Sequence, residues 1–223
     1  MLDPRESILA CACDLYLSHG LAGLSMRKLA REVGVTAPAL YRHYDGREAV
    51  LADLVRHAHR VFLGYLYRGL EAPTPAERFA GAADGYLEFA LEHPRWYAIM
   101  FSGPERLGME SIPDDIESMG CAIHQFWNDR VTECMRTGVL KEGDPRDVSL
   151  TMWAHAHGLV QLFHQGRLNT DKAGFRRLVK ESSERLFVGV VTEDFAARLE
   201  MKEATQGAGS ASLAAGHTAI RGS

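Results

Sequence analysis

Long hydrophobic runs are missing from this sequence of 223 residues. No stretch of about 18 consecutive apolar residues occurs, so we expect no membrane-spanning helix and no membrane partner. Asp3 and Glu6 interrupt the N-terminal region, in which a secretory signal would carry positive charge. The four cysteines form no Cys-x-x-Cys pair, which argues against a disulfide framework. Together these absences predict a cytoplasmic protein with reduced cysteines.

Signatures of catalysis are missing as well. The sequence contains no glycine-rich phosphate loop, no nucleophile elbow and no paired metal ligands. His155 and His157 would point to different sides of a helix, and His157 and His164 would lie about two turns apart, too far to share one small ion. We therefore expect no enzymatic activity, no cofactor and no bound metal.

The formal net charge of −4 hides an uneven distribution of basic residues. Residues 1–60 hold eight Arg or Lys against seven Asp or Glu, and the remaining residues hold 17 against 22. Within residues 25–47 there are five basic residues and only two acidic ones. This local concentration of positive charge indicates a surface that contacts an anionic partner.

Helical periodicity runs through nearly the whole chain, and we find no convincing strand. A first helix is stopped by Gly20, and two short helices follow with Ser25 and Thr36 as N-caps and Gly34 in the turn between them. A fourth apolar stripe then continues for about six turns, which is typical of a connecting helix. We predict an all-α fold.

The rest of the chain divides into further helices and a tail. Two helices follow the prolines near residue 74, the segment SGPERLGMESIPDD is predicted to be an exposed loop, and three more helices are expected at 116–135, 147–163 and 171–191. Residues 1–46 would form a helix-turn-helix domain and residues 47–200 a helical domain that binds a ligand and dimerises. Residues 201–223 are expected to be a disordered tail.

The two short helices have the layout of a helix-turn-helix, in which the second helix enters the major groove of DNA. Ala30 would lie where the helices cross, and an apolar wedge would be formed by Leu29, Val33, Val35 and Leu40. Tyr44 is expected to turn inward. The remaining polar and aromatic groups around the second helix are too numerous to be buried, so they need a partner, and DNA matches them.

Each exposed group has a role that DNA chemistry favours. Arg27 and Arg42 are able to contact guanine O6 and N7 bidentately, and Ala37, Pro38 and Ala39 suit thymine methyl groups. Phosphate contacts suit the remaining predicted residues, which are Thr36, Tyr41, His43 and Arg47. The predicted partner is double-stranded operator DNA.

The segment LSMRKLAREVGVTAPALYRHYDGREAVLADLV resembles the DNA-binding domain of the TetR family of bacterial transcriptional regulators. It has that family's pattern of R-x-[IL]-A, then G-V, then the aromatic-rich L-Y-x-[HY]-[FVY] and a basic residue after a small or polar turn. The likeness covers residues 8–55 and implies that the residues assigned above occupy DNA-contacting positions. One departure is Arg47, where the family commonly has Lys.

Two later segments also resemble parts of TetR-like proteins. TMWAHAHGLVQLFHQGRL is similar to a helix with the pattern W-x-x-x-H-G, here Trp153, His157 and Gly158, and EHPRWYAIMF is similar to the sixth-helix region. Small residues and an apolar stripe in the last two long helices favour a homodimer through a four-helix interface.

A small-molecule effector would bind among aromatic, methionine and polar side chains of the second domain. The predicted pocket residues are Trp96, Met100, Phe101, His124, Trp127, Trp153, His157 and Gln161. The alternative is that these residues form an ordinary packed core.

We therefore expect a ligand-responsive transcriptional regulator, a repressor that a small apolar or aromatic molecule releases from its operator. The alternative is a DNA-associated structural or occlusion protein of the same fold without a small-molecule inducer. A sealed core would favour that alternative, and a cavity would favour the regulator.

Overall fold

The computed structural model describes residues 4–199 and 201, and its elements in chain order are helices. They are α1 (Pro4–Gly23), α2 (Met26–Val33), α3 (Ala37–Tyr41), α4 (Arg47–Tyr67), the 3-10 helix η1 (Arg68–Glu71), α5 (Pro75–Glu92), α6 (Pro94–Met100), α7 (Pro104–Leu107), α8 (Asp114–Arg136), α9 (Pro145–His164) and α10 (Lys172–Phe187). The described residues contain no strand beyond one isolated bridge, which confirms the all-α prediction. The predicted tail lies outside the described residues except for Met201.

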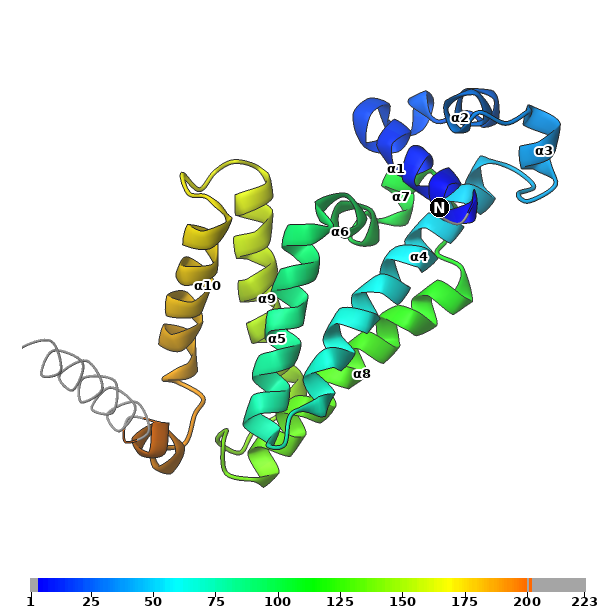
Figure 1. Ribbon diagram of the computed structural model, residues 1–223. Helices are drawn as coiled ribbons and strands as arrows, with labels where there is room; N and C mark the ends of the chain where they lie inside the picture. Colours follow the sequence, from blue (N-terminus) through cyan, green and yellow to red (C-terminus); the bar gives the residue numbers. More distant parts are fainter. Residues whose placement is uncertain (1–3, 200, 202–223) are drawn as a thin grey trace, which may run out of the picture.

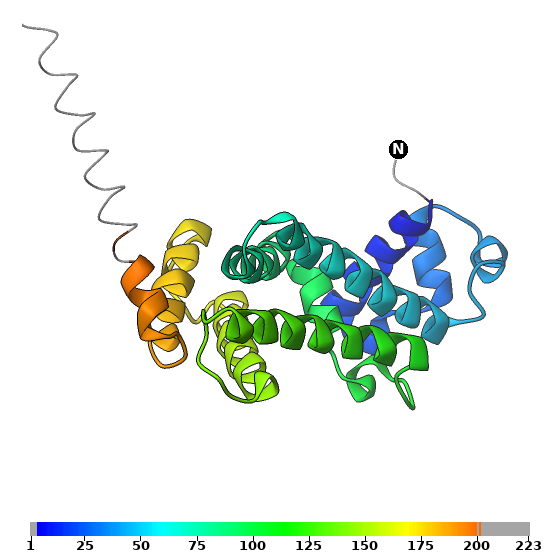
Figure 2. The same cartoon turned by 90° about the horizontal axis from the view of Figure 1, so that it is seen from below.

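The helices form two regions joined by α4 (Figure 1). α1, α2 and α3 gather at one end, and α4 runs from them into a larger bundle that contains α5, α8, α9 and α10. Viewed from below, α10 and the α2–α3 pair lie at opposite ends of the molecule (Figure 2). We call α1–α3 with the first half of α4 the head, and the remaining helices the body. None of the described helices has the length and apolar character needed to cross a bilayer.

The ends of the short helices follow from local chemistry. The Ser25 hydroxyl accepts a hydrogen bond from the Lys28 N–H at 3.2 Å and begins α2. Gly34 ends α2 with a φ of 79°, a left-handed conformation that only glycine adopts without strain. The Thr36 hydroxyl then accepts from the Ala39 N–H at 3.3 Å and begins α3. These three predictions are confirmed.

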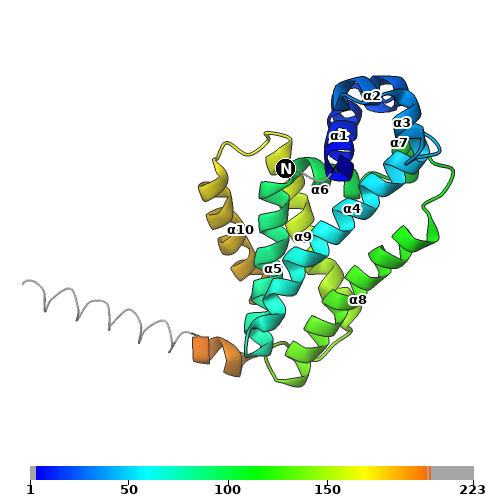
Figure 3. The same ribbon diagram turned by 45° about the vertical axis from the view of Figure 1, so that its right-hand side comes forward.

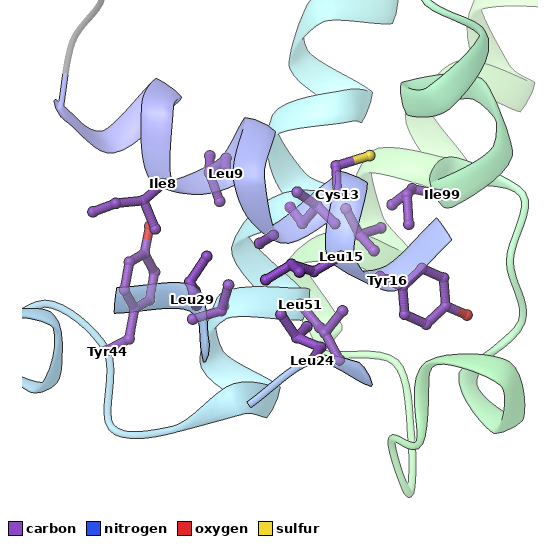
Figure 4. Packing of buried hydrophobic residues seen from close by; sticks show 14 of the residues in the cluster. Ile8, Leu9, Cys13, Leu15, Tyr16, Leu24, Leu29, Tyr44, Leu51 and Ile99 are labelled. Carbon is purple, nitrogen blue, oxygen red and sulfur yellow. The ribbon is translucent and has the colours of Figure 1, made fainter. Parts of the chain in front are cut away.

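The core of the head is built around α1, α2, α3 and α4, and residues of α6, α7 and α8 complete it (Figure 4). Leu9 from α1, Leu29 from α2, and Leu51 from α4 are at most 1% exposed, and they pack in one cluster. Burying one such leucine stabilises the fold by about 1.5–3 kcal/mol. Tyr44 is buried in the same cluster, as predicted. Val35, however, is 40% exposed, so its predicted place in the apolar wedge is wrong.

The segment predicted to be an exposed loop packs against the core of the head instead. It contains the short helix α7, and Leu107 is completely buried in the head's core together with Ile99 of α6. The Tyr16 hydroxyl on α1 donates to the Arg106 carbonyl at 2.8 Å. The glycines and prolines of this segment mark its turns correctly. The burial comes from isolated apolar side chains that have no helical period.

The core of the body begins in the second half of α4. Phe62 and Leu66 pack with residues of α5, α6, α8 and α9, whereas Val55 and the residues before it pack in the head. The apolar contacts therefore change partner within α4, while the predicted domain boundary lies between residues 46 and 47. α4 and α5 approach closely at Gly85, where an added Cβ would lie 2.3 Å from the Tyr65 carbonyl oxygen. Figure 3 shows α8 running beside α4, on the side of α4 that faces away from α5.

Candidate nucleic-acid interface and internal cavity

The nine residues predicted to contact DNA lie on neighbouring segments at the outer end of the head. We call this set the recognition surface, and it consists of Arg27, Thr36, Ala37, Pro38, Ala39, Tyr41, Arg42, His43 and Arg47. Six of them are exposed, and Ala37, Ala39 and Arg47 are half-buried. The structure therefore brings the predicted residues together at the end of the head that is formed by α2, α3 and the start of α4 (Figure 1).

The two arginines predicted to contact bases are available for an external partner. Arg27 and Arg42 are exposed, and neither side chain has a hydrogen bond or ion pair within the part of the chain that the structure describes. Arg31, which is not on the recognition surface, is paired with Glu32 at 3.3 Å. Tyr41 is 52% exposed, although a ring of this size normally finds cover in a folded protein.

Arg47 differs from the other members of the recognition surface. It is the first residue of α4, and its guanidinium Nη1 donates to the Leu21 carbonyl at 3.4 Å. Part of its hydrogen-bonding capacity is therefore directed at the end of α1. Its remaining donors lie beside the N-terminus of α4, where backbone N–H groups favour an anion.

A buried carboxylate on α4, that of Asp53, connects this helix to the rest of the head. Asp53 is 2% exposed, and it accepts hydrogen bonds from the Tyr44 hydroxyl at 2.7 Å and from Arg5 Nη2 at 2.7 Å. Burial raises the pKa of Asp53. The hydrogen bonds from Arg5 and Tyr44 and the charge of Arg5 together lower it by more, so the pKa of Asp53 lies below its ordinary value. Asp53 therefore ties the start of α1 and the turn that follows α3 to α4.

The body contains a cavity of about 520 Å³ between α4, α5, α6, α8 and α9, and it is partly open to solvent. Five predicted pocket residues line it, from α6, its C-cap, α8 and α9: Met100, Phe101, His124, Trp127 and Trp153. The volume is within the range of sites that hold drug-sized molecules. Most of the wall is aromatic or aliphatic, and few polar groups interrupt it.

The other three predicted pocket residues lie outside this cavity. Trp96 packs against His57 with ring centroids 4.8 Å apart. His157 lies behind the Phe101 and Trp153 rings, and its Nδ1 is 2.6 Å from the Tyr97 hydroxyl oxygen. Gln161 lies one turn further along α9, with its Nε2 3.4 Å from His157 Nε2. Burial lowers the pKa of His157, so its imidazole is neutral at pH 7.

Several lining residues were not predicted, among them His59, Tyr86, Asn128 and Arg146. His59 is a histidine in the long apolar stripe of α4, which is a signal that sequence inspection can find. Arg146 lies in the first turn of α9, where the sequence gives no sign that a basic residue is more than an ordinary surface residue. Only the packing of α9 against α8 shows that it borders the cavity.

A second cavity of about 90 Å³ adjoins the first between α5, α9 and α10. The two cavities share the side chains of Tyr86, Trp127, Ser149 and Trp153. His155 borders the smaller one, and its buried Nε2 has no hydrogen-bond partner. Among the described residues, no group of three or more His, Cys, Asp or Glu side chains is arranged to hold a metal ion.

Two family models match this chain and together span most of it. Residues 8–54 match the model of bacterial regulatory proteins of the tetR family, and residues 79–207 match the tetracyclin repressor-like C-terminal domain. The chain belongs to the TetR family. TetR-family regulators bind operator DNA and ligands and form dimers, so this protein is a helix-turn-helix transcriptional regulator.

This TetR-family protein is similar over nearly their full length to two known proteins. The HTH-type transcriptional regulator Rv1816 of Mycobacterium tuberculosis is 24% identical over 86% of this chain and 95% of that protein. A protein of unknown function from Rhodococcus sp. RHA1 is 27% identical, with a TM-score of 0.71 over 86% of this chain and 97% of that one.

A solved structure with a similar fold contains both a small molecule and DNA. AibR, in complex with isovaleryl coenzyme A and operator DNA, has a TM-score of 0.64 over 78% of this chain and 94% of that one. Its sequence identity to this TetR-family chain is 16%, so the likeness shows a shared fold.

Proposed function

We propose that this protein is a homodimeric, cytoplasmic repressor that a small, largely apolar or aromatic molecule releases from its operator. The recognition surface contacts the operator, and the effector binds in the 520 Å³ cavity of the body. The last two long helices, α9 and α10, form the dimer interface. Each of these helices has only one buried residue in the single chain, and the exposed apolar side chains of Leu162 on α9 (42% exposed) and Val188 directly after α10 (75% exposed) support this interface.

The observation that carries this proposal is the double role of α4. Its first half supplies Leu51 and Val55 to the core of the head, and its second half supplies His59 and Phe62 to the cavity wall. A molecule that enters the cavity therefore contacts the same helix against which α1, α2 and α3 pack. Packed helices move as rigid bodies, so a shift of α4 at the cavity changes the position of the head.

Release from DNA needs only a modest difference in ligand affinity between two arrangements of the dimer. Operator half-sites lie about one helical turn or more apart, so two recognition helices must keep a matching separation. A ligand that favours another separation weakens operator binding by the coupling free energy, which is typically about 1–3 kcal/mol. AibR, which shares the fold, has been solved with a coenzyme A thioester and operator DNA together.

The alternative function is a DNA-associated structural or occlusion protein without an inducer. A sealed core would favour it. The cavity of about 520 Å³, bordered by Arg146 and by five phenylalanine, tyrosine and tryptophan rings, favours a ligand-responsive regulator instead.

An operator-binding measurement tests the DNA half of the proposal. Wild-type protein is used to select a binding fragment from random DNA, and dissociation constants are measured at fixed salt. Arg42→Ala or Arg27→Ala is expected to weaken binding by about 1–3 kcal/mol per half-site, because each removes a base contact. Arg167→Ala, at an exposed arginine beyond the far end of α9, is the matched control. Unchanged binding in both recognition-surface variants would overturn the proposal.

A further inference from the structure

We propose that the effector is an amphipathic anion, whose apolar or aromatic body fills the cavity and whose acidic group pairs with Arg146 at the rim. This inference rests on the ligand-binding function proposed above and adds the chemical class of the ligand. It follows from the charges around the cavity, from the state of the less exposed polar groups in its wall, and from the absence of a protein partner for the Arg146 guanidinium.

The charge around the cavity is of one sign. Arg146 is the only Lys or Arg among the described residues that line it, and this lining contains no Asp or Glu. Arg146 is exposed, in the first turn of α9. The neighbouring Asp144 is occupied as the helix cap, because its Oδ1 accepts from the Arg146 backbone N–H at 2.9 Å.

The guanidinium of Arg146 has no partner in the protein. The described residues place no hydrogen-bond acceptor or carboxylate in contact with it, whereas Arg78 and Arg130 in the body both form ion pairs with Glu133. An arginine offers five N–H donors in a planar fork that matches a carboxylate, sulfonate or phosphate group. A single unpaired guanidinium at the mouth of an apolar cavity is therefore complementary to an anion.

The polar groups deeper in the wall carry no charge that would compete. Val55 O can only accept a hydrogen bond, so His59 Nδ1, 2.9 Å from it, must carry the proton. Burial lowers the pKa of His59, which leaves its imidazole neutral with Nε2 as an acceptor. The Tyr86 hydroxyl is kept protonated because burial raises its pKa. Ser149 Oγ donates to Asn128 Oδ1 at 2.5 Å, and neither of these side chains can carry a charge.

This arrangement also fixes the orientation of the ligand. An ionised group placed against the aromatic wall would lose its hydration without finding a counter-charge, which disfavours that orientation. At the rim it stays partly hydrated and meets Arg146. The apolar end then lies between Phe62, Trp127 and Trp153, and a hydroxyl or N–H group on it would find His59 Nε2.

A pair of fluorescent dyes that differ in one acidic group tests the inference. 8-Anilino-1-naphthalenesulfonate carries a sulfonate, and N-phenyl-1-naphthylamine has the same two aromatic ring systems without it. The full-length Trp96→Phe variant is used as the background. Its two remaining tryptophans, Trp127 and Trp153, both line the cavity, so energy transfer from them to the dye reports occupancy.

The sulfonate is expected to bind about tenfold more tightly than the neutral dye, the usual effect of one charge-assisted hydrogen bond at a partly exposed site. Arg146→Gln is expected to remove this preference and to change the affinity for the neutral dye by less than about twofold. Arg167→Gln should leave both affinities unchanged. Equal affinities in the background protein, or an equal loss of both in Arg146→Gln, would overturn the proposal.

Gly120→Phe shows whether the dyes occupy the cavity. Gly120 borders it on α8, and an added Cβ meets no atom within 4 Å, so a phenyl ring can extend into the open space. Loss of both dyes in this variant supports the inference, and full retention, or failure of both dyes to bind the background protein, contradicts it. No DNA is present, so a failed operator measurement leaves this result standing, and a missing charge preference leaves operator binding untouched.

Discussion

The recognition surface comes from one stretch of 21 residues, from Arg27 to Arg47, whereas the cavity is lined by residues from five helices between His59 and Trp153. The first site is positioned by neighbours in sequence: two N-caps, one left-handed glycine and one inward tyrosine. The second exists only after distant helices pack against one another. DNA binding therefore depends on local geometry and exposed charge, and ligand binding depends on tertiary packing.

The two regions also differ in how they tolerate change. The head is small, and nearly every apolar residue of its core is buried. Truncation of a side chain there therefore leaves a void that the close-packed neighbours do not fill. The body already contains open space beside half-buried side chains such as Ile123 and Trp127. Substitutions that reduce or fill volume should therefore have unequal effects in the two regions.

The largest expected effect is on the core of the head. Leu51→Ala should lower the free energy of unfolding by about 2–5 kcal/mol, because Leu51 is completely buried between α4 and the rest of the head. Ile123→Ala in the cavity wall is the matched comparison. It should cost about 1 kcal/mol or less, since Ile123 is half-buried beside existing space. Urea denaturation measures both, and equal losses would refute the contrast between the regions.

Asp53→Asn is expected to cost about 1–3 kcal/mol at pH 7. The substitution removes the charge that holds Tyr44 and Arg5, but the Arg5 side chain is 56% exposed and remains hydrated. The folded pKa of Asp53 lies below its ordinary value of 3.8, so its contribution is fully present above that pH and is lost as the pH falls through the folded pKa. Denaturation of both proteins at pH 7 and near pH 3 should show that the difference between their free energies of unfolding becomes smaller in acid. A difference that becomes larger in acid would contradict a lowered pKa of Asp53.

Tyr97→Phe should have a smaller effect, about 0.5–1.5 kcal/mol. The completely buried Tyr97 hydroxyl lies 2.6 Å from both the Tyr86 hydroxyl oxygen and His157 Nδ1. Tyr86 also lies 3.4 Å from the same nitrogen, so it can take over part of the contact. Thermal unfolding followed by circular dichroism measures the change. A loss well above this range would show that the three groups depend on one another more strongly than these distances indicate.

Gly120→Phe is expected to change stability least. Gly120 lies inside α8 and its side chain would enter open space, so the gain in helix propensity, up to about 1 kcal/mol, offsets any local strain. The variant should unfold within about 1 kcal/mol of the wild type and bind the operator unimpaired or more weakly, according to whether the ring mimics a ligand. A strongly destabilised variant would mean that the cavity is narrower than about 520 Å³.

The features of the head that could be predicted from the sequence are local ones. Ser25, Gly34 and Thr36 act within four residues of their own position, and Tyr44 follows the apolar spacing of Leu40. Val35 was misplaced because it directly precedes the cap of α3, where the chain leaves the helical period.

The cavity could be predicted only in part, since its lining depends on which helix faces meet. Aromatic content near Phe101 and Trp153 pointed to the correct region. Trp96 has the same chemistry, but it faces His57 on α4 and lies away from the space. Leu107 is buried although glycine and proline surround it, because α7 is held against α1 by contacts between residues about 90 apart, such as Tyr16 and Arg106. No local pattern records such contacts.

The most direct test of the central claim, that filling the cavity is felt at the recognition surface, is the operator dissociation constant with and without 8-anilino-1-naphthalenesulfonate. It is measured at fixed salt, with cavity occupancy followed by energy transfer from Trp127 and Trp153. Saturating dye should weaken operator binding by about 5-fold or more, and the operator should weaken dye binding by the same factor. An unchanged operator constant at full occupancy of the cavity would contradict the account.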